Sequence, residues 1–244
     1  MCTLEKRGDI FFLTLTADDE HRLNPSLIDS LRSALRQAKD ESSRGSALVT
    51  SAQGKFFSNG FDLAWAQSSA AAAGGGGSAH ERLLQMVEMF RPAVADFIGL
   101  PMPTIAAVTG HAAAAGMMLA LSHDYVLMRG DRGVLYMSEL DIGMTFPDYF
   151  TALVRSKVGS SAARRDVLLK AGKMKAAEAM AMGIVDSVHS SGEATVEAAL
   201  HLGEELVKRK WDGEVYAEIR KSLYPELCGV LGLVSKEVVA SPRL

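Results

Sequence analysis

The composition is that of a globular chain without nucleic-acid partners. Its 244 residues are 48% hydrophobic and 23% charged, which is enough to bury a full core in one large domain or in a domain with an appendage. The formal net charge is −3. Basic residues are scattered except for a short cluster at 208–210, so the sequence carries no basic surface of the kind that binds nucleic acid.

Cysteine and histidine spacing predicts no metal site. Cys2 and Cys228 lie near opposite ends of the chain, with no CxxC pair and no histidine nearby, and the histidines lack the spacing typical of metal ligands. We therefore expect neither zinc nor a disulfide framework, and a reducing compartment fits best. The first residues lack an apolar signal core, and no run of about 18 apolar residues follows, so neither secretion nor membrane insertion is expected.

The first half of the chain alternates extended and helical patterns. Strand-forming residues fill 9–17, and 24–41 is predicted to be an amphipathic helix with Asn24 as N-cap and Pro25 in its first turn. Further short strands are predicted at 46–52, 104–110, 124–130 and 133–139. Helical segments separate the earlier strands, so the sequence predicts an α/β fold with a largely parallel sheet.

A low-complexity stretch of serine, alanine and glycine occupies 68–81. Its four consecutive glycines lose much conformational entropy when they are ordered. Because the predicted strands on both sides belong to one sheet, we expect a mobile loop there and not a linker between domains.

The pattern becomes helical after residue 148. Two short helices are predicted with Gly172 and Gly183 as C-caps, and long amphipathic runs follow from about 193 to 235. These features indicate an all-helical section after the α/β core.

The chain ends in Pro242, Arg243 and Leu244. This tripeptide resembles the S-K-L type of peroxisomal address, with proline in place of serine, and it would then be bound by a peroxisomal import receptor. An arbitrary tail that ends in leucine is the equal alternative.

The segment 108–124 places a glycine, four alanines and a second glycine between a predicted strand and a predicted helix. Small side chains let the backbone turn tightly there and let a ligand approach the free amides at the start of the helix. Such amides can hold a developing negative charge. Close packing of a helix on a sheet also selects alanine and glycine, so this segment alone leaves both interpretations open.

A second segment, 54–63, follows a predicted strand and again places a glycine beside a turn. Its "FFSNGFDL" and the later "AAVTGHAAAAGMMLALSHDYVLM" together resemble the paired signature of the enoyl-CoA hydratase/isomerase family, also called the crotonase family. The resemblance extends to "RLNPSLIDSL", "SELDIGMTFPDYF" and "KAAEAMAMGIVDSV" and so covers nearly the whole chain. It implies a crotonase (ClpP/crotonase-like) fold, with a repeated ββα core over 1–190 and a C-terminal helical region over 191–244 that drives trimer formation in relatives.

The resemblance also implies which residues form the site. In the family, two backbone N–H groups hold the thioester oxygen in an oxyanion hole, and they fall here on Phe61 and on Ala115, in a run that is three glycines in the family. Contacts to the substrate and its CoA are implied at Ser58, Asn59, Gly60, Asp62, Leu63, Ala114, Gly116 and Met118. Alanine keeps its N–H, but the added methyl groups leave less room for the acyl chain and are expected to require ordinary backbone dihedral angles.

Two glutamates perform hydration in the family's hydratases, and this sequence keeps one of them. The first position falls on Met118, which cannot transfer a proton, and the second on Glu139, four residues before Gly143. Moving a double bond from the 3,4 to the 2,3 position needs one base that reaches C2 and C4, so Glu139 suffices as both base and acid. In a closed site its apolar neighbours are expected to raise its pKa.

Other candidates are weaker. Asp148 is either a second acid or, by preference, a cap for the helix that starts there, and Asp62 is expected to cap the helix after the first loop. Asp141 is expected to be solvated. His111 is expected to be packed or exposed and not a base, and Lys55 to be exposed and not bound to a CoA phosphate.

We therefore predict isomerisation of cis or trans 3-enoyl-CoA to trans-2-enoyl-CoA, in the β-oxidation of unsaturated fatty acids. No cofactor is expected, because CoA is part of the substrate. The segments "GMTFPDYF" and "FSNGFDLAWAQ", with the tail, most resemble the plant peroxisomal branch of the family's delta(3)-delta(2)-enoyl-CoA isomerases. The alternatives are a hydratase, thioesterase or decarboxylase of the same family, or a non-catalytic acyl-CoA-binding subunit. A homo-oligomer, trimer or hexamer, is expected.

Overall fold

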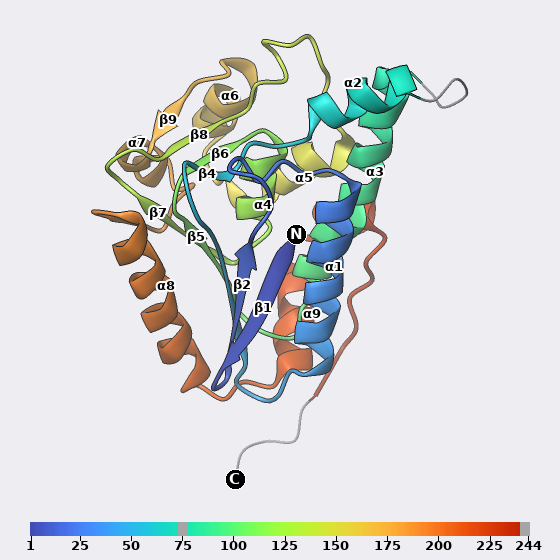
Figure 1. The fold of residues 1–244 in the computed structure, drawn as a ribbon. Helices are drawn as coiled ribbons and strands as arrows, with labels where there is room; N and C mark the ends of the chain where they lie inside the picture. Colours follow the sequence, from blue (N-terminus) through green and yellow to red (C-terminus); the bar gives the residue numbers. More distant parts are fainter. Residues whose placement is uncertain (73–77, 240–244) are drawn as a thin grey trace.

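The computed structural model describes residues 1–72 and 78–239, which form two β-sheets with helices packed around them (Figure 1). The larger sheet has the strand order β1-β2-β3-β5-β7-β10. Its strands are β1 (Cys2–Arg7), β2 (Ile10–Leu15), β3 (Ala47–Ala52), β5 (Thr104–Val108), β7 (Tyr125–Arg129) and β10 (Ser187–His189). The β1–β2 hairpin is antiparallel and the other pairings are parallel, so the prediction of a largely parallel α/β sheet is confirmed.

The second sheet is small, and of its strands the sequence predicted only the one within 133–139. It has the order β4-β6-β8-β9, from β4 (Phe56–Ser58), β6 (His111–Ala113), β8 (Val134–Tyr136) and β9 (Met174–Lys175). Strands of two or three residues are too short for an alternating pattern to be recognised. The sheet matters because β4 and β6 lead into the two segments that resemble the family signature.

Helix α1 (Pro25–Asp40) forms as the sequence predicts. The side chain of Asn24 accepts a hydrogen bond from the Leu27 amide at 3.0 Å, and Pro25 occupies the first turn, where its missing N–H is not needed. Leu27, Ile28 and Leu31 lie on the buried face. This face anchors the helix against the hydrophobic core.

Helices cover both faces of the larger sheet. Helix α8 (Gly192–Val207) packs on one face, where Ala199 contacts the cluster formed by Val49, Ile105 and Leu127. Helices α1, α3 (Ala79–Ile98) and α9 (Gly213–Leu223) lie on the other side of the sheet (Figure 1). The C-terminal helical region, which also includes α10 (Pro225–Leu231), thus packs directly on the α/β core.

Two local expectations need correction. The stretch 68–81 is not a loop at its ends, because α2 (Leu63–Ala72) and α3 extend into it, and residues 73–77 lie outside the described part of the chain. Gly172 is not a helix cap, because α6 (Ser161–Leu169) ends earlier and Ala171 takes the left-handed conformation, with φ +48°. The other predicted cap is confirmed, since Gly183 follows α7 (Ala176–Ala181) with φ +70°.

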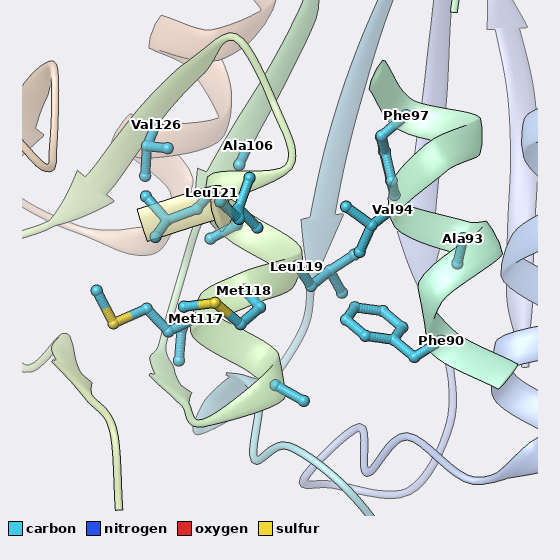
Figure 2. Packing of buried hydrophobic residues seen from close by; sticks show 14 of the residues in the cluster. Phe90, Ala93, Val94, Phe97, Ala106, Met117, Met118, Leu119, Leu121 and Val126 are labelled. Carbon is cyan, nitrogen blue, oxygen red and sulfur yellow. The ribbon is translucent and has the colours of Figure 1, made fainter. Parts of the chain in front are cut away.

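The centre of the core is a helix without an exposed face. All seven residues of α4 (Ala115–Leu121) are buried. Figure 2 shows Met118 and Leu119 of this helix in the core together with Phe90 and Val94 of α3. The apolar sequence of α4 therefore serves packing along its whole length, and only the turn before it reaches the site.

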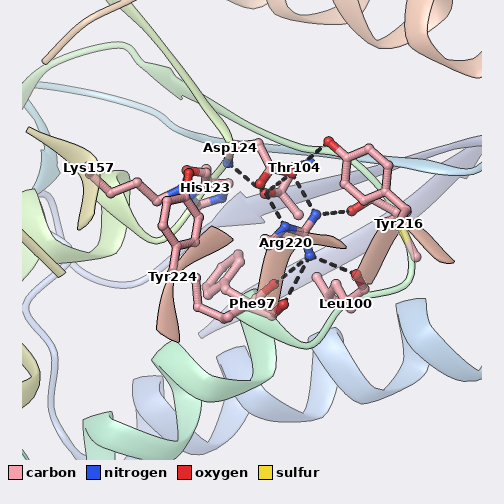
Figure 3. A network of polar contacts seen from close by, with 11 residues as sticks. Phe97, Leu100, Thr104, His123, Asp124, Lys157, Tyr216, Arg220 and Tyr224 are labelled. Carbon is pink, nitrogen blue, oxygen red and sulfur yellow. Dashed lines mark hydrogen bonds and ion pairs between the residues drawn. The ribbon is translucent and has the colours of Figure 1, made fainter. Parts of the chain in front are cut away.

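A buried ion pair connects α9 to the core. Arg220 donates to the Asp124 carboxylate at 2.6 Å, and the two side chains are 3% and 13% exposed. Arg220 also donates to the carbonyl oxygens of Leu100, at 2.7 Å, and Met102 (Figure 3). Burial raises the pKa of Asp124, but the Arg220 guanidinium outweighs it and holds that pKa below its ordinary value.

We expect Arg220→Ala to lower the free energy of unfolding by about 3–5 kcal/mol, because it leaves the Asp124 carboxylate buried without its counter-charge. Urea unfolding followed by circular dichroism measures this. The control is Arg155→Ala, which breaks the exposed pair with Glu226 and should cost about 1 kcal/mol or less. Equal effects of the two variants would contradict the assigned role of Arg220.

Candidate active site

The two signature segments touch through their backbones. A Cβ built on Gly116 would lie 2.2 Å from the Ser58 carbonyl oxygen, so only glycine permits this approach. Gly60 has φ +75°, and a Cβ there would lie 3.0 Å from the Ala113 carbonyl oxygen. The turn after β4 and the turn before α4 therefore lie against each other, although about 55 residues separate them along the chain.

Two backbone amides at this contact have no acceptor among the residues that the structure describes. Gly60 O accepts from the Leu23 amide and Leu23 O accepts from the Asp62 amide, which leaves the N–H of Phe61 between them unbonded. The amide of Ala115 opens α4 and is also unbonded. Free amides at a cavity wall are suited to hold an oxyanion.

Ala114 does not have ordinary dihedral angles, so that expectation is wrong. Its φ of +48° and ψ of −122° lie in a region that glycine populates freely and residues with a Cβ avoid. Holding a side chain in such a region costs about 1–3 kcal/mol. Ala114 thus holds a conformation that suits glycine, at a cost in strain.

A cavity of about 420 Å³ lies beside this contact. Phe61, Ala114 and Glu139 all line it, so the structure brings one predicted amide donor, the strained alanine and the predicted base to the same space. Apolar side chains form much of its wall, namely Leu63, Leu83, Leu84, Val87, Ile142, Met144, Phe146 and Phe150. These side chains suit an acyl chain, and the polar and charged residues of the same wall can orient it.

Glu139 is the buried carboxylate of this cavity. Its side chain lies in the turn before α5 (Asp148–Lys157), is 7% exposed, and its Oε2 atom accepts no hydrogen bond from the described residues. Burial raises its pKa, and backbone amides of Glu139 and Ser138 offset only part of the rise. A carboxylate without a counter-charge is poised to take up a proton. Asp141, two residues on, is exposed as expected.

The other predicted contact residues divide into two groups. Asn59 and Leu63 line the cavity. Ser58 and Gly116 lie behind its wall, where the Ser58 hydroxyl donates to the His21 carbonyl at 2.7 Å. Asp62 caps α2, as predicted, by accepting from the Trp65 amide at 2.9 Å.

Met118 does not line the cavity. Its side chain is wholly buried in the core between α4 and α3 (Figure 2). The sequence placed it at the position of a hydratase glutamate and among the substrate contacts. The structure places no carboxylate at this position and turns the methionine into the packed interior.

Asp148 lies in the cavity wall but is already paired. It is the first residue of α5, not its N-cap, which is Pro147. Its carboxylate accepts from Arg91 at 2.8 Å and from the Tyr149 amide at 2.7 Å. The Arg91 guanidinium holds the pKa of Asp148 below its ordinary value, so this carboxyl is ionised near neutral pH and has no proton to donate.

The sequence did not identify Arg91 as a site residue. Arg91 lies on α3, lines the cavity with Glu88, and also donates to the Val230 carbonyl at 3.0 Å. Arg91 therefore connects the cavity wall to helix α10. A long-range pair of this kind has no local signal, since Arg91 and Asp148 are 57 positions apart.

The remaining candidates lie as expected. The His111 ring packs edge-on against Phe56 with their centroids 5.2 Å apart. Lys55 is exposed, with its ammonium 5.5 Å from the centroid of the Phe56 ring. No group of metal-binding side chains occurs among residues 1–72 and 78–239, and no helix there is long and apolar enough to cross a membrane.

Comparisons with known proteins identify relatives of this chain. A family model described as enoyl-CoA hydratase/isomerase matches residues 5–223. The chain is 62% identical to Arabidopsis thaliana enoyl-CoA delta isomerase 2, peroxisomal, over 100% of both chains. It is 61% identical to Arabidopsis enoyl-CoA delta isomerase 3, over 98% of both chains. A solved Mycobacterium tuberculosis enoyl-CoA isomerase superimposes with a TM-score of 0.81 at 20% identity, covering 95% of this chain and 94% of the other, which shows the shared fold.

We expect Glu139→Gln to raise the Tm near pH 7.5 by about 2–4 °C. The folded-state pKa of Glu139 is raised, so the ionised form penalises folding, and the penalty grows as pH rises through that pKa. The gain should shrink towards pH 4, where the carboxyl is neutral in both states. Differential scanning calorimetry across this range measures it. Asp141→Asn, which neutralises an exposed carboxylate, is the control, and its Tm should follow that of the wild type. A gain in Tm for Glu139→Gln that does not depend on pH would refute the raised pKa of Glu139.

Proposed function

This chain belongs to the enoyl-CoA hydratase/isomerase family, and we propose that it is an enoyl-CoA delta isomerase that converts cis or trans 3-enoyl-CoA to trans-2-enoyl-CoA. One observation carries the choice of reaction. An unpaired carboxylate, that of Glu139, lines the cavity together with Phe61 and Ala114 from the two turns that carry the free amides. The high identity to named delta isomerases supports the same choice.

The first step is removal of a proton from C2 of the substrate. The Glu139 carboxylate takes this proton, and the electron pair of the C2–H bond moves into the thioester to give a dienolate. The negative charge develops on the thioester oxygen. The amides of Phe61 and Ala115 would donate to that oxygen and stabilise the charge without a metal ion.

The second step returns the proton at C4. The electron pair of the dienolate oxygen re-forms the carbonyl, the pair between C1 and C2 becomes the new C2=C3 bond, and the former C3=C4 pair binds the proton held by Glu139. A neutral carboxyl is a donor of suitable strength when burial has raised its pKa. The carboxylate is restored, so one residue completes the cycle.

Hydration is disfavoured by the same arrangement. It needs one group to activate water and another to deliver a proton, and the second family position holds Met118, which lies in the core. The remaining carboxylates of the cavity wall do not replace it, because Asp148 is paired with Arg91 and Glu88 also contacts Arg91. A thioesterase or decarboxylase would use the same oxyanion site, so turnover must separate these alternatives.

We propose that the reaction serves β-oxidation of unsaturated fatty acids in the peroxisome. Two Arabidopsis relatives carry "peroxisomal" in their names. The tripeptide Pro242, Arg243 and Leu244, which lies outside the described residues, is the proposed address. A fluorescent fusion that enters peroxisomes only when these three residues are present would support this location.

A homo-oligomer, trimer or hexamer, is proposed for the assembly. Two apolar side chains of α9, Ile219 and Leu223, are 63% and 65% exposed and lie beside Trp211 and Tyr216 in a groove. Exposed apolar area of this kind is commonly covered by another chain. Light scattering of the purified protein reads the assembly directly, and a monomer would exclude it.

We expect wild-type protein to isomerise trans-3-hexenoyl-CoA and to hydrate trans-2-hexenoyl-CoA very slowly. Glu139→Gln should lower isomerisation by about 10²–10⁴-fold, the usual contribution of a general acid–base group, while CoA esters still bind. In the wild type, kcat/KM should fall on acidification with a midpoint above the ordinary glutamate pKa of about 4.3. A coupled spectrophotometric assay measures the isomerisation rate, the hydration rate and the pH dependence of kcat/KM.

Asp141→Asn is the matched control and should retain wild-type rates. Comparable hydration and isomerisation would favour a hydratase. Binding without turnover of either substrate would favour the non-catalytic subunit.

A further inference from the structure

Ala114 lines the cavity, and its methyl group lies close to Gly60. Its amide donates to the Tyr136 carbonyl at 2.8 Å, and its carbonyl accepts from the amides of Met117 and Met118 at 2.9 and 3.1 Å. Both polar groups are therefore engaged within the protein. Ala114 nevertheless lines the cavity, whereas Ala113 before it is buried. What a ligand meets at this position is the Cα and the methyl group.

This methyl group is held against the preference of the backbone. With φ +48° and ψ −122°, the turn would be more stable with glycine, which the chain uses at Gly60 and Gly116 on either side of the contact. Strained residues that persist in a cavity wall point to a functional constraint. The constraint then applies to the side chain of Ala114 and not to the conformation of the turn.

The methyl group lies next to the amide assigned to the thioester oxygen. A Cβ built on Gly60 would be 3.2 Å from the Ala114 Cβ and 3.4 Å from the Ala115 nitrogen. The Ala114 methyl group and the Ala115 amide therefore both lie close to Gly60. An oxygen bound by such an amide lies about 2.7–3.1 Å from the nitrogen. The carbonyl carbon and C2 of the acyl group are then the substrate atoms nearest to the methyl group.

We propose that Ala114 is a specificity-determining residue that excludes acyl-CoA thioesters with a substituent at C2, such as a 2-methyl group, and admits unbranched chains. The inference rests on the proposed function, because that function fixes where the thioester oxygen binds. A hydrogen at C2 fits beside the Ala114 methyl group, and a second methyl group there overlaps it. One carbon group in a close-fitting apolar site changes kcat/KM by about 10- to 200-fold.

The test compares wild type, Ala114→Gly and Ala113→Gly with trans-3-hexenoyl-CoA and its 2-methyl derivative. Ala113→Gly removes the same methyl group one residue earlier, from a buried position outside the cavity wall. Ala114→Gly should raise the ratio of kcat/KM for the branched over the unbranched substrate by about tenfold or more. Ala113→Gly should leave this ratio unchanged. Because Ala114→Gly relieves strain, the variant is expected to fold.

Calorimetric binding of the saturated 2-methylhexanoyl-CoA and hexanoyl-CoA gives a readout that needs no turnover. The wild type should prefer the unbranched ester, and Ala114→Gly should reduce that preference. An unchanged preference in both assays, or a wild type that accepts both substrates equally, overturns the inference. No turnover of trans-3-hexenoyl-CoA by the wild type, with the binding preference still reduced in Ala114→Gly, would instead refute the proposed reaction and keep the role of Ala114.

Discussion

The site depends on one contact between two backbone segments that only glycine permits. A side chain on Gly116 would begin 2.2 Å from the Ser58 carbonyl, and one on Gly60 would begin 3.0 Å from the Ala113 carbonyl. Because the turns touch, the free amide of Phe61 lies in the cavity wall and that of Ala115 lies directly after Ala114, which is also in this wall. Preorganised donors need no rearrangement when charge develops, which is why a rigid backbone contact serves this chemistry.

The carboxylates of Asp124 and Glu139 both lie largely inside the protein, and their surroundings shift their pKa values in opposite directions. Asp124 is surrounded by donors and by Arg220, so its pKa is lowered and its charge is permanent, which suits a structural pair between α9 and the core. Glu139 has no counter-charge, so burial raises its pKa and its proton can come and go. The ion pair that connects α9 to the core thus lies outside the cavity wall, and the carboxylate inside that wall is the proposed catalytic group.

Sequence patterns predicted the parallel strands and α1 with its Asn24 cap, because periodicity and capping chemistry are local. The family resemblance implied Phe61 and Glu139, which both line the cavity, and their roles in the reaction stay predictions. The sequence patterns predicted only the strand within 133–139 of the small second sheet, because its other strands are too short to show a period. They also missed the pairing of Arg91 with Asp148, which only tertiary structure creates. The dihedral angles of Ala114 were predicted wrongly, since alanine normally avoids them and tertiary contact overrides that preference here.

In the proposed reaction, one buried carboxylate carries a single proton from C2 to C4. A single-turnover reaction of 2,2-dideuterated trans-3-hexenoyl-CoA in ordinary water tests it most directly, with mass spectrometry and NMR locating the label in the product. The account predicts that much of the deuterium removed from C2 appears at C4, because Glu139 is largely closed to solvent. A product whose C4 carries only solvent hydrogen would contradict the single-carboxylate shuttle.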